Sequence, residues 1–367
     1  MSNILNEFIE LVQIDSDSLN ERNMADALTA KLKEIGCDVW EDKEMIEDIG
    51  GTAGNLYGVL EGTCPGSILF SAHMDRVANG HGIKPVVNDG IVTAQGTILA
   101  ADDISGVCAI LDGLRRVKAS GKPYPRVEVI FSVSEEKGVT GSRYIKYDRL
   151  LSKEGYALDS PGRIGRVINA APSAATITFE VEGKNAHAGN APEQGINAVM
   201  AAAKVLSRLP DGRLDFESTA NYSTFEAVGP TNVVNAKAVV KGESRSRSNE
   251  KLDNYLELVQ KTCDEVAAET GAKITLDIFR KYRGFVVEPE TSCIGRLKKV
   301  YDEMGIDMLV EKGGGGMDAN RLNEHGIACV GVATGYFKNH SVNEHLYVED
   351  LERSGEMVER IIYNAAE

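Results

Sequence analysis

The feature that most limits the fold of this chain is an alternation of short apolar runs with helical stretches in its N-terminal half. The apolar runs occupy residues 55–60, 67–72, 127–133 and 156–158. Amphipathic patterns at residues 106–117 and 140–147 lie between the last three runs and predict helices. Strands that alternate with helices typically form a mostly parallel sheet that helices cover on both faces. The pattern therefore predicts an α/β domain with a mixed, mostly parallel sheet flanked by helices.

A different pattern begins after Pro172. Apolar and polar residues alternate from residue 176 to 182, which is typical of a half-buried strand. Helix, strand, strand, helix and strand patterns then follow at residues 196–206, 222–228, 233–241, 252–266 and 274–278. This order is that of ferredoxin-like α+β modules. We expect residues 173–282 to form an inserted α+β domain, and residues 1–172 and 283–367 to form the α/β domain together.

Composition and charge argue against several classes of partner. The chain has 40 basic and 55 acidic residues and a formal charge of -15, which is a poor match for nucleic acid or an anionic membrane. No apolar run approaches the length of about 20 residues that a transmembrane helix needs, and the first residues lack the regions of a signal peptide. The six cysteines are scattered, which is typical of a reducing compartment. We expect a cytoplasmic protein that binds neither nucleic acid nor membrane.

Histidine and carboxylate side chains follow three of the predicted strands. One strand ends in His73, with Asp75 two residues later. The next runs into Glu135 and Glu136, and a third ends in Asp159. Because ligand sites in open α/β sheets lie at the carboxyl ends of strands, we expect these side chains to share one edge of the sheet.

Two further candidates are Asp102, which precedes a predicted helix, and His340, which follows the apolar run 328–332. His345 is the alternative to His340. Taken singly, the His73 motif is more typical of a buried histidine bonded to an aspartate, and Asp102 is more typical of a helix-capping acid. The glutamate pair alone also fits an exposed acidic turn. The joint occurrence of these motifs at one edge of one sheet favours a functional site.

The residue types at this edge indicate metal chemistry. Histidine and carboxylate ligands without thiolates suit zinc, with cobalt and manganese as alternatives. Hydrolases commonly hold a pair of such ions about 3.5–4 Å apart, which polarise a carbonyl and lower the pKa of a water. A spare carboxylate beside that water then acts as general base. The residues therefore predict a hydrolase with two divalent ions.

These segments resemble the co-catalytic zinc metallopeptidase family that includes peptidase T, carboxypeptidase G and aminoacylase (metallopeptidase family 20). The shared elements occur in the family's order: H-x-D-x-V from His73, A-D-D-x-x-G around Asp102, the glutamate pair, the lone Asp159, and H-S-x-x-E from His340. The resemblance covers nearly the whole chain and implies the zinc-peptidase type of α/β fold. The G-G-G-G-M-D run and the A-D-D stretch are most similar to peptidase T-like members.

The resemblance implies a role for each candidate ligand. Asp102 would bridge the two metal ions. His73 and Asp159 would complete one ligand set, and Glu136 and His340 would complete the other.

The same resemblance assigns the groups around the metals. Glu135 would be the general base, and Asp75 would hold His73 in place. The peptide bond after Asp102 would be cis. The glycine-rich loop that contains Gly314 and Gly315 would contact the substrate.

The inserted domain would be a lid and dimerisation domain. His187 would be a lid histidine that stabilises the oxyanion. Asn232 and Arg245 would bind the carboxylate or backbone of the substrate. Arg247 is the alternative to Arg245, since either guanidinium suits a carboxylate. The lid would swing about connections near Pro172 and Tyr282. Both a monomer and a lid-paired homodimer remain open.

We therefore expect a zinc-dependent amide hydrolase that acts on small peptides, with tripeptidase-like release of the N-terminal residue. An N-acyl amino acid deacylase or a carboxypeptidase with the same metal site is the alternative. A non-catalytic metal-binding protein is a third hypothesis, and the presence of Glu135 and of all five proposed ligands argues against it.

Overall fold

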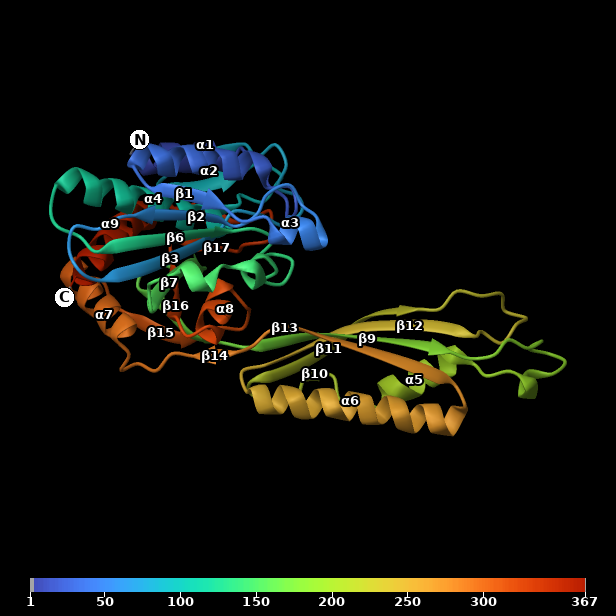
Figure 1. Ribbon diagram of the computed structural model, residues 1–367. Helices are drawn as coiled ribbons and strands as arrows, with labels where there is room; N and C mark the ends of the chain where they lie inside the picture. Colours follow the sequence, from blue (N-terminus) through green and yellow to red (C-terminus); the bar gives the residue numbers. More distant parts are fainter. Residues whose placement is uncertain (1–2, 367) are drawn as a thin grey trace. The chain divides into compact units, whose positions relative to one another are not determined.

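The apolar runs of the N-terminal half lie in a nine-stranded sheet in the computed structural model of the protein, which describes residues 3–366 (Figure 1). Its strands are β1 (Asp38–Glu41), β2 (Leu56–Leu60), β3 (Ser67–His73), β6 (Arg126–Ser132), β7 (Glu154–Ser160), β8 (Arg166–Ala171), β14 (Phe285–Val286), β15 (Leu309–Lys312) and β16 (Ala328–Ala333). Their order is β1-β2-β6-β3-β7-β16-β8-β14, and β15 pairs with β8. The central strands β6, β3, β7 and β16 run parallel, whereas the strands at the margins add antiparallel pairs. The predicted mixed α/β sheet with a parallel centre is confirmed.

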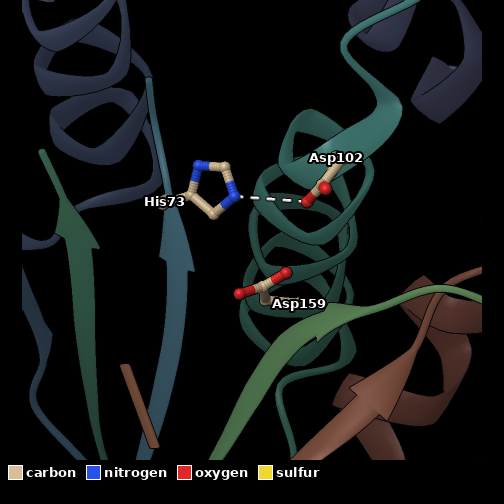
Figure 2. Close-up of side chains that lie close together, drawn as sticks. All are labelled: His73, Asp102 and Asp159. Carbon is tan, nitrogen blue, oxygen red and sulfur yellow. Dashed lines mark hydrogen bonds and ion pairs between the residues drawn. The ribbon is translucent and has the colours of Figure 1, made fainter. Parts of the chain in front are cut away.

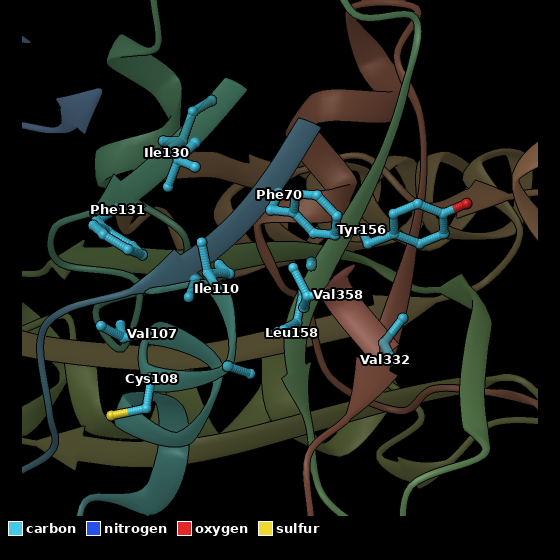
Figure 3. Close-up of a cluster of buried hydrophobic side chains, with 14 of the residues drawn as sticks. Phe70, Val107, Cys108, Ile110, Ile130, Phe131, Tyr156, Leu158, Val332 and Val358 are labelled. Carbon is cyan, nitrogen blue, oxygen red and sulfur yellow. The ribbon is translucent and has the colours of Figure 1, made fainter. Parts of the chain in front are cut away.

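Helices flank this sheet. They are α1 (Asn3–Leu11), α2 (Arg22–Ile35), α3 (Glu44–Ile49), α4 (Ala101–Ser120), α7 (Ser292–Met304), α8 (Asp318–Glu324) and α9 (Val348–Asn364). Helix α4 packs against β3 and β7, and α1 and α9 pack against α4. Figure 3 shows part of the resulting core, where Phe70, Phe131 and Tyr156 of the strands meet Val107 and Ile110 of α4. Because the central strands are buried on both faces, their sequences are almost continuously apolar.

A second, four-stranded sheet was not predicted from the sequence. It consists of β4 (Pro85–Asn88), β5 (Ile91–Ala94), β17 (Tyr336–Phe337) and β18 (His345–Tyr347), in the order β17-β18-β5-β4 with antiparallel pairs. The loop between β17 and β18 carries His340. This small sheet therefore anchors a candidate site residue that the sequence analysis placed only after an apolar run.

The predicted helix at residues 140–147 is wrong. The segment instead forms two short 3₁₀ turns, at Gly141–Tyr144 and Tyr147–Arg149. Gly141 lies so close to the preceding strand that a Cβ there would come within 1.9 Å of the carbonyl oxygen of Val133. Such tertiary contacts override the local amphipathic pattern.

Residues 172–284 form a compact unit of their own, and residues 1–171 and 285–367 form the other. The unit contains β9 (Ser173–Glu182), α5 (Ala198–Arg208), β10 (Gly212–Arg213), β11 (Ser218–Glu226), β12 (Lys237–Ser246), α6 (Asn249–Thr270) and β13 (Lys273–Tyr282). Its antiparallel sheet has the order β10-β11-β12-β9-β13, and the four long strands follow the ferredoxin-like pattern. The side chains of α5 and α6 form a separate core with the apolar residues of this sheet.

In the described residues, no helix is both long and apolar enough to cross a membrane.

Arg76 is a fully buried side chain that ties the N-terminal segment to the end of β3. Its guanidinium donates to the carbonyl oxygens of Val12 at 3.0 Å and Gly80 at 2.8 Å, to the carbonyl oxygen of Ile14, and to Ser16 Oγ at 3.2 Å. Burial lowers the pKa of Arg76 to about 10. The arginine therefore supplies donors to a segment whose backbone acceptors face the interior.

Replacement of Arg76 by alanine is expected to lower the free energy of unfolding by about 3 kcal/mol, because it leaves buried carbonyl oxygens without donors. Urea unfolding followed by circular dichroism measures this loss. Arg22→Ala is the control, since the Arg22 side chain is 36% exposed and its removal should cost about 1 kcal/mol or less. Equal losses in the two variants would contradict the interpretation.

Candidate active site

The candidate residues lie at the carboxyl ends of three adjacent strands. Strand β3 lies between β6 and β7 in the sheet, so the three strand ends are neighbours. His73 is the last residue of β3, Asp159 is near the end of β7, and Glu135 and Glu136 follow β6. The sheet thus brings together the side chains that the sequence analysis expected to share one edge.

One potential ligand group consists of His73, Asp102 and Asp159, whose nearest ligand atoms all lie within 4.8 Å of one another. Figure 2 shows these three side chains converging from β3, from the start of α4 and from β7. His73 Nε2 lies 3.2 Å from Asp102 Oδ1. Asp102 and Asp103 have non-helical backbone angles within the first turn of α4, and the peptide bond between them is cis.

A second potential group consists of Asp102, Glu136 and His340, again with ligand atoms within 4.8 Å of one another. His340 Nε2 lies 2.8 Å from Glu136 Oε1 and 3.2 Å from Asp102 Oδ2. The two carboxylate oxygens of Asp102 therefore face different groups, Oδ1 toward His73 and Oδ2 toward His340. This shared carboxylate is the central geometric feature of the site.

His345, the alternative to His340, lies elsewhere. Its Nδ1 is 3.0 Å from the carbonyl oxygen of Asn343, and its ring stacks on Phe337 with 5.6 Å between the ring centroids. The structure therefore brings His340, and not His345, to the carboxylates.

Asp75 connects His73 to the glutamate pair. His73 Nδ1 lies 3.0 Å from the carbonyl oxygen of Asp75 and 3.4 Å from Asp75 Oδ1. The same carboxylate accepts hydrogen bonds from the backbone N–H groups of Glu135 at 2.9 Å and Glu136 at 3.2 Å. Acceptors on the Nδ1 side hold the hydrogen of Nδ1, so Nε2 can bind a metal ion when it gives up its own proton, as a metal-binding histidine requires.

Three polar residues of the site were missed in the sequence analysis or left without a role. Tyr336 Oη lies 3.2 Å from both Asp102 Oδ1 and Asp159 Oδ1, and its single hydrogen serves one of them at a time. Asn339 Nδ2 donates to Asp102 Oδ2 at 2.6 Å. Buried Glu344 accepts from three backbone N–H groups of residues 99–102, including that of Asp102 at 3.0 Å. Only Glu344 had a signal, as the last residue of the H-S-x-x-E motif.

The site contains more buried carboxylates than positively charged groups. Loss of solvent and the charge of Asp159 raise the pKa of Glu135 well above its usual range, and loss of solvent and Asp102 do the same to the pKa of Asp159. Hydrogen bonds with Asp102 and Glu136 raise the pKa of His340 to about 10. Burial opposes the protonation of His73, but its bonds to Asp102 and Asp75 outweigh this and raise its pKa. The donor set and its charge deficit fit divalent cations.

The glycine-rich loop lies in the same unit as these carboxylates. Gly314 and Gly315 are exposed, and a Cβ at either position would meet no other atom within 4 Å. Asp318 and Asn320, which follow this loop in the sequence, are buried. Asp318 accepts from the hydroxyl groups of Ser71 at 3.2 Å and of Ser132, so it joins α8 to β3 and β6.

The remaining candidates belong to the unit of residues 172–284. Exposed His187 accepts at Nδ1 from the N–H groups of Gly189 and Asn190, each at 3.1 Å, which leaves the hydrogen of the neutral ring on Nε2. The backbone of exposed Asn232 accepts from Ala188 N at 2.9 Å, so residues 187 and 232 lie on paired segments.

The two alternative arginines differ in their contacts. Arg245 on β12 forms an ion pair of 2.5 Å with Glu243 and remains 37% exposed. Arg247 donates to the carbonyl oxygen of Phe216 at 3.0 Å.

Comparison with known proteins places the chain among peptidases. Residues 69–364 match the model of peptidase family M20/M25/M40. The chain belongs to this family. An uncharacterised protein of Bacillus subtilis, YqjE, is 38% identical over 99% of this chain and 98% of its own length.

Two solved family structures share the fold. The aminopeptidase PepT of Bacillus cereus ATCC 10987 has a TM-score of 0.91 at 36% identity, and a tripeptidase of Staphylococcus aureus has a TM-score of 0.93 at 31% identity. Each comparison covers 99% of this chain and 98% of the other. The resemblance drawn from the motifs is confirmed: the protein is an M20 family peptidase, a hydrolase with peptidase T-like relatives.

The metal-free protein is expected to lose stability as pH rises from about 6 to about 9. Glu135 and Asp159 have raised pKa values, and so have His73 and His340. Groups of this kind favour folding most below their unfolded-state pKa values, and they lose that contribution as pH rises through the folded-state values. Divalent cations replace the lost protons, so the difference in Tm between metal-loaded and metal-free protein should widen toward alkaline pH.

Scanning calorimetry of chelator-treated and zinc-loaded protein at several pH values measures this difference. Asp102 acts in the opposite direction because His340 and His73 lower its pKa, but its contribution changes only in acid. A difference in Tm that stays constant with pH would contradict the prediction.

Proposed function

We propose that the protein is a two-metal aminopeptidase that releases the N-terminal residue of small peptides, with tripeptides as the first choice of substrate. The observation that carries the proposal is the shared carboxylate of Asp102, which faces one group of candidate ligands with each oxygen. The similarity to an aminopeptidase and to a tripeptidase, each over 99% of this chain, supports the choice of substrate.

In this proposal His73 and Asp159 complete one ligand set around Asp102, and Glu136 and His340 complete the other. Nitrogen and oxygen donors without thiolates suit zinc best, with cobalt or manganese as alternatives. When bound, two such ions would polarise the scissile carbonyl and lower the pKa of a water, which makes that water a better nucleophile.

Glu135 is the proposed general base. It is 8% exposed and its backbone N–H is held by Asp75, so its position is defined. Its carboxylate takes a proton from the attacking water and then delivers it to the nitrogen of the leaving amine. A carboxyl whose pKa lies above its usual range is better suited to the second transfer than an ordinary glutamate.

The unit of residues 172–284 is proposed as a lid that binds substrate. His187 is its candidate oxyanion donor, which its Nε2 hydrogen supports. Asn232 is its candidate for the substrate backbone, and Arg245 is its candidate for the carboxylate, with Arg247 as the alternative, since either guanidinium suits a carboxylate. Gly314 and Gly315 would let the substrate approach the backbone of their loop.

Three further parts of the proposal concern the whole molecule. The lid moves about its two connections near Pro172 and Tyr282, and it also offers a surface for a homodimer. The enzyme works in the cytoplasm, which is supported by six cysteines that are all free. Its partners are small peptides, and not nucleic acid or membranes.

Glu135→Gln is expected to lower kcat by about 1,000-fold or more, because the amide cannot accept the proton of the water. Metal content, measured by mass spectrometry of the purified protein, should stay unchanged, since Glu135 is not in either ligand set. A variant that keeps the wild-type rate would show that the base is another residue.

Substrate choice is tested with a matched pair, a tripeptide and the same tripeptide with an acetylated N-terminus. The aminopeptidase cleaves the free peptide and releases its first residue. Rapid cleavage of N-acetyl amino acids, or release of the C-terminal residue, would instead identify the deacylase or the carboxypeptidase. Chelation should abolish the activity, and zinc should restore it.

A further inference from the structure

The backbone that leads into Glu135 is held in an unusual way. The N–H groups of residues 133, 134, 135 and 136 all donate to side-chain oxygens and not to a neighbouring strand. Asn55 Oδ1 accepts from residue 133 at 3.2 Å, Glu21 Oε1 from residue 134 at 3.0 Å, and the two oxygens of Asp75 from residues 135 and 136. Three buried side chains thus fix four consecutive peptide groups.

Ser134 is the residue in this segment with the least favourable backbone. Its φ is 50°, in the left-handed region that residues other than glycine rarely adopt. Glu21 Oε1 accepts from both its N–H and its hydroxyl group, each at 3.0 Å. Because Ser134 immediately precedes Glu135, a change of its φ would redirect the side chain of the proposed base.

The N-terminal segment that supplies Glu21 is itself bound to the same place. Leu19 N lies 2.8 Å from Glu21 Oε1 and 3.1 Å from Ser134 Oγ. Ser18 Oγ donates to Asp75 Oδ2 at 2.6 Å. These residues precede the part of the chain that matches the family model.

We propose that Ser18 and Glu21 are positioning residues that hold the left-handed Ser134, and with it the general base Glu135, in the reactive arrangement. The proposal rests on the assignment of Glu135 as the base. Ser18 acts through Asp75, and Glu21 acts directly on Ser134. Neither residue belongs to the candidate ligand sets, and among residues 3–366 their side chains bond to Asp75, Leu19 and Ser134 instead.

Glu21 acts as a hydrogen-bond acceptor and not as a charge. One oxygen, Oε1, receives all three of its hydrogen bonds, and within residues 3–366 no group donates to buried Oε2. Burial and the nearby Asp75 raise the pKa of Glu21 to about 7, so an uncharged form is readily populated. Glutamine keeps one carbonyl oxygen and should therefore replace glutamate, whereas alanine should not.

The test compares Glu21→Ala, Glu21→Gln and Ser18→Ala with the wild type. Glu21→Ala should lower kcat by about 10- to 100-fold, as loss of such outer contacts usually does, with KM and metal content unchanged. Glu21→Gln should stay within about threefold of the wild type and keep its pH profile, because the three accepted bonds remain. Ser18→Ala should lose up to about tenfold, since one bond to Asp75 is removed.

Hydrogen–deuterium exchange supplies a readout other than activity. In Glu21→Ala the amides of residues 133–136 should exchange faster than in the wild type, with and without metal. Glu7→Ala is the matched control, because Glu7 is another buried glutamate of the same unit, bound to Arg115 at 2.7 Å. It should lose stability but keep its kcat and the exchange of residues 133–136.

Wild-type kcat and exchange in folded Glu21→Ala would overturn the proposal, and so would a shifted pH profile in Glu21→Gln. If Glu21→Ala does not fold, a wild-type kcat in Ser18→Ala together with a 100-fold loss in Glu21→Gln overturns it instead. Glu135→Gln is measured in parallel. If Glu135→Gln keeps the wild-type rate, the assignment of the base is wrong. If Glu135→Gln is inactive and Glu21→Ala is fully active, only the positioning proposal is wrong.

Discussion

The arrangement of this site depends on the cost of gathering carboxylates where water is scarce. Asp159 and Glu135 lie at the ends of strands beside Asp102 at the start of α4, and burial and neighbouring carboxylates raise the pKa values of Glu135 and Asp159. Much of what surrounds them offsets this cost. The two imidazoles of His73 and His340 and the amide of Asn339 all direct nitrogen at Asp102. The same deficit of positive charge makes this group of side chains suitable for divalent cations.

Much of the fold and of the candidate cluster follows from local patterns. Apolar runs of strand length identified β2, β3, β6 and β7. Because ligand sites lie at the carboxyl ends of strands, the sequence also predicted that His73, Glu135 and Asp159 share one edge of the sheet. The helix expected at residues 140–147 failed because a glycine there fits against the carbonyl of Val133, a contact that no periodicity reveals. The small sheet was not predicted because its strands are only two to four residues long, too short to give a clear pattern.

The groups that support the cluster could not be read from the sequence at all. Tyr336 follows a buried apolar run and looks like a core aromatic, and Glu21 looks like an ordinary acidic residue at the start of a helix. Each acquires its role from a partner more than 100 positions away, Asp102 and Ser134 respectively. Asp318 is a similar case, since nothing in the sequence beside the glycine-rich loop indicates that its buried carboxylate accepts from the hydroxyl groups of Ser71 and Ser132.

The loop between β17 and β18 has a consequence for how the enzyme is made. Its His340 contacts Glu136 across 204 positions, and its Glu344 holds the turn at Asp102 across 242. A ribosome therefore releases the carboxylates of the N-terminal half, and the whole inserted unit, before the residues that complete the cluster exist. Since long-range contacts form late and at an entropic cost, Asp102 and Glu136 lack these partners until almost the whole chain has emerged.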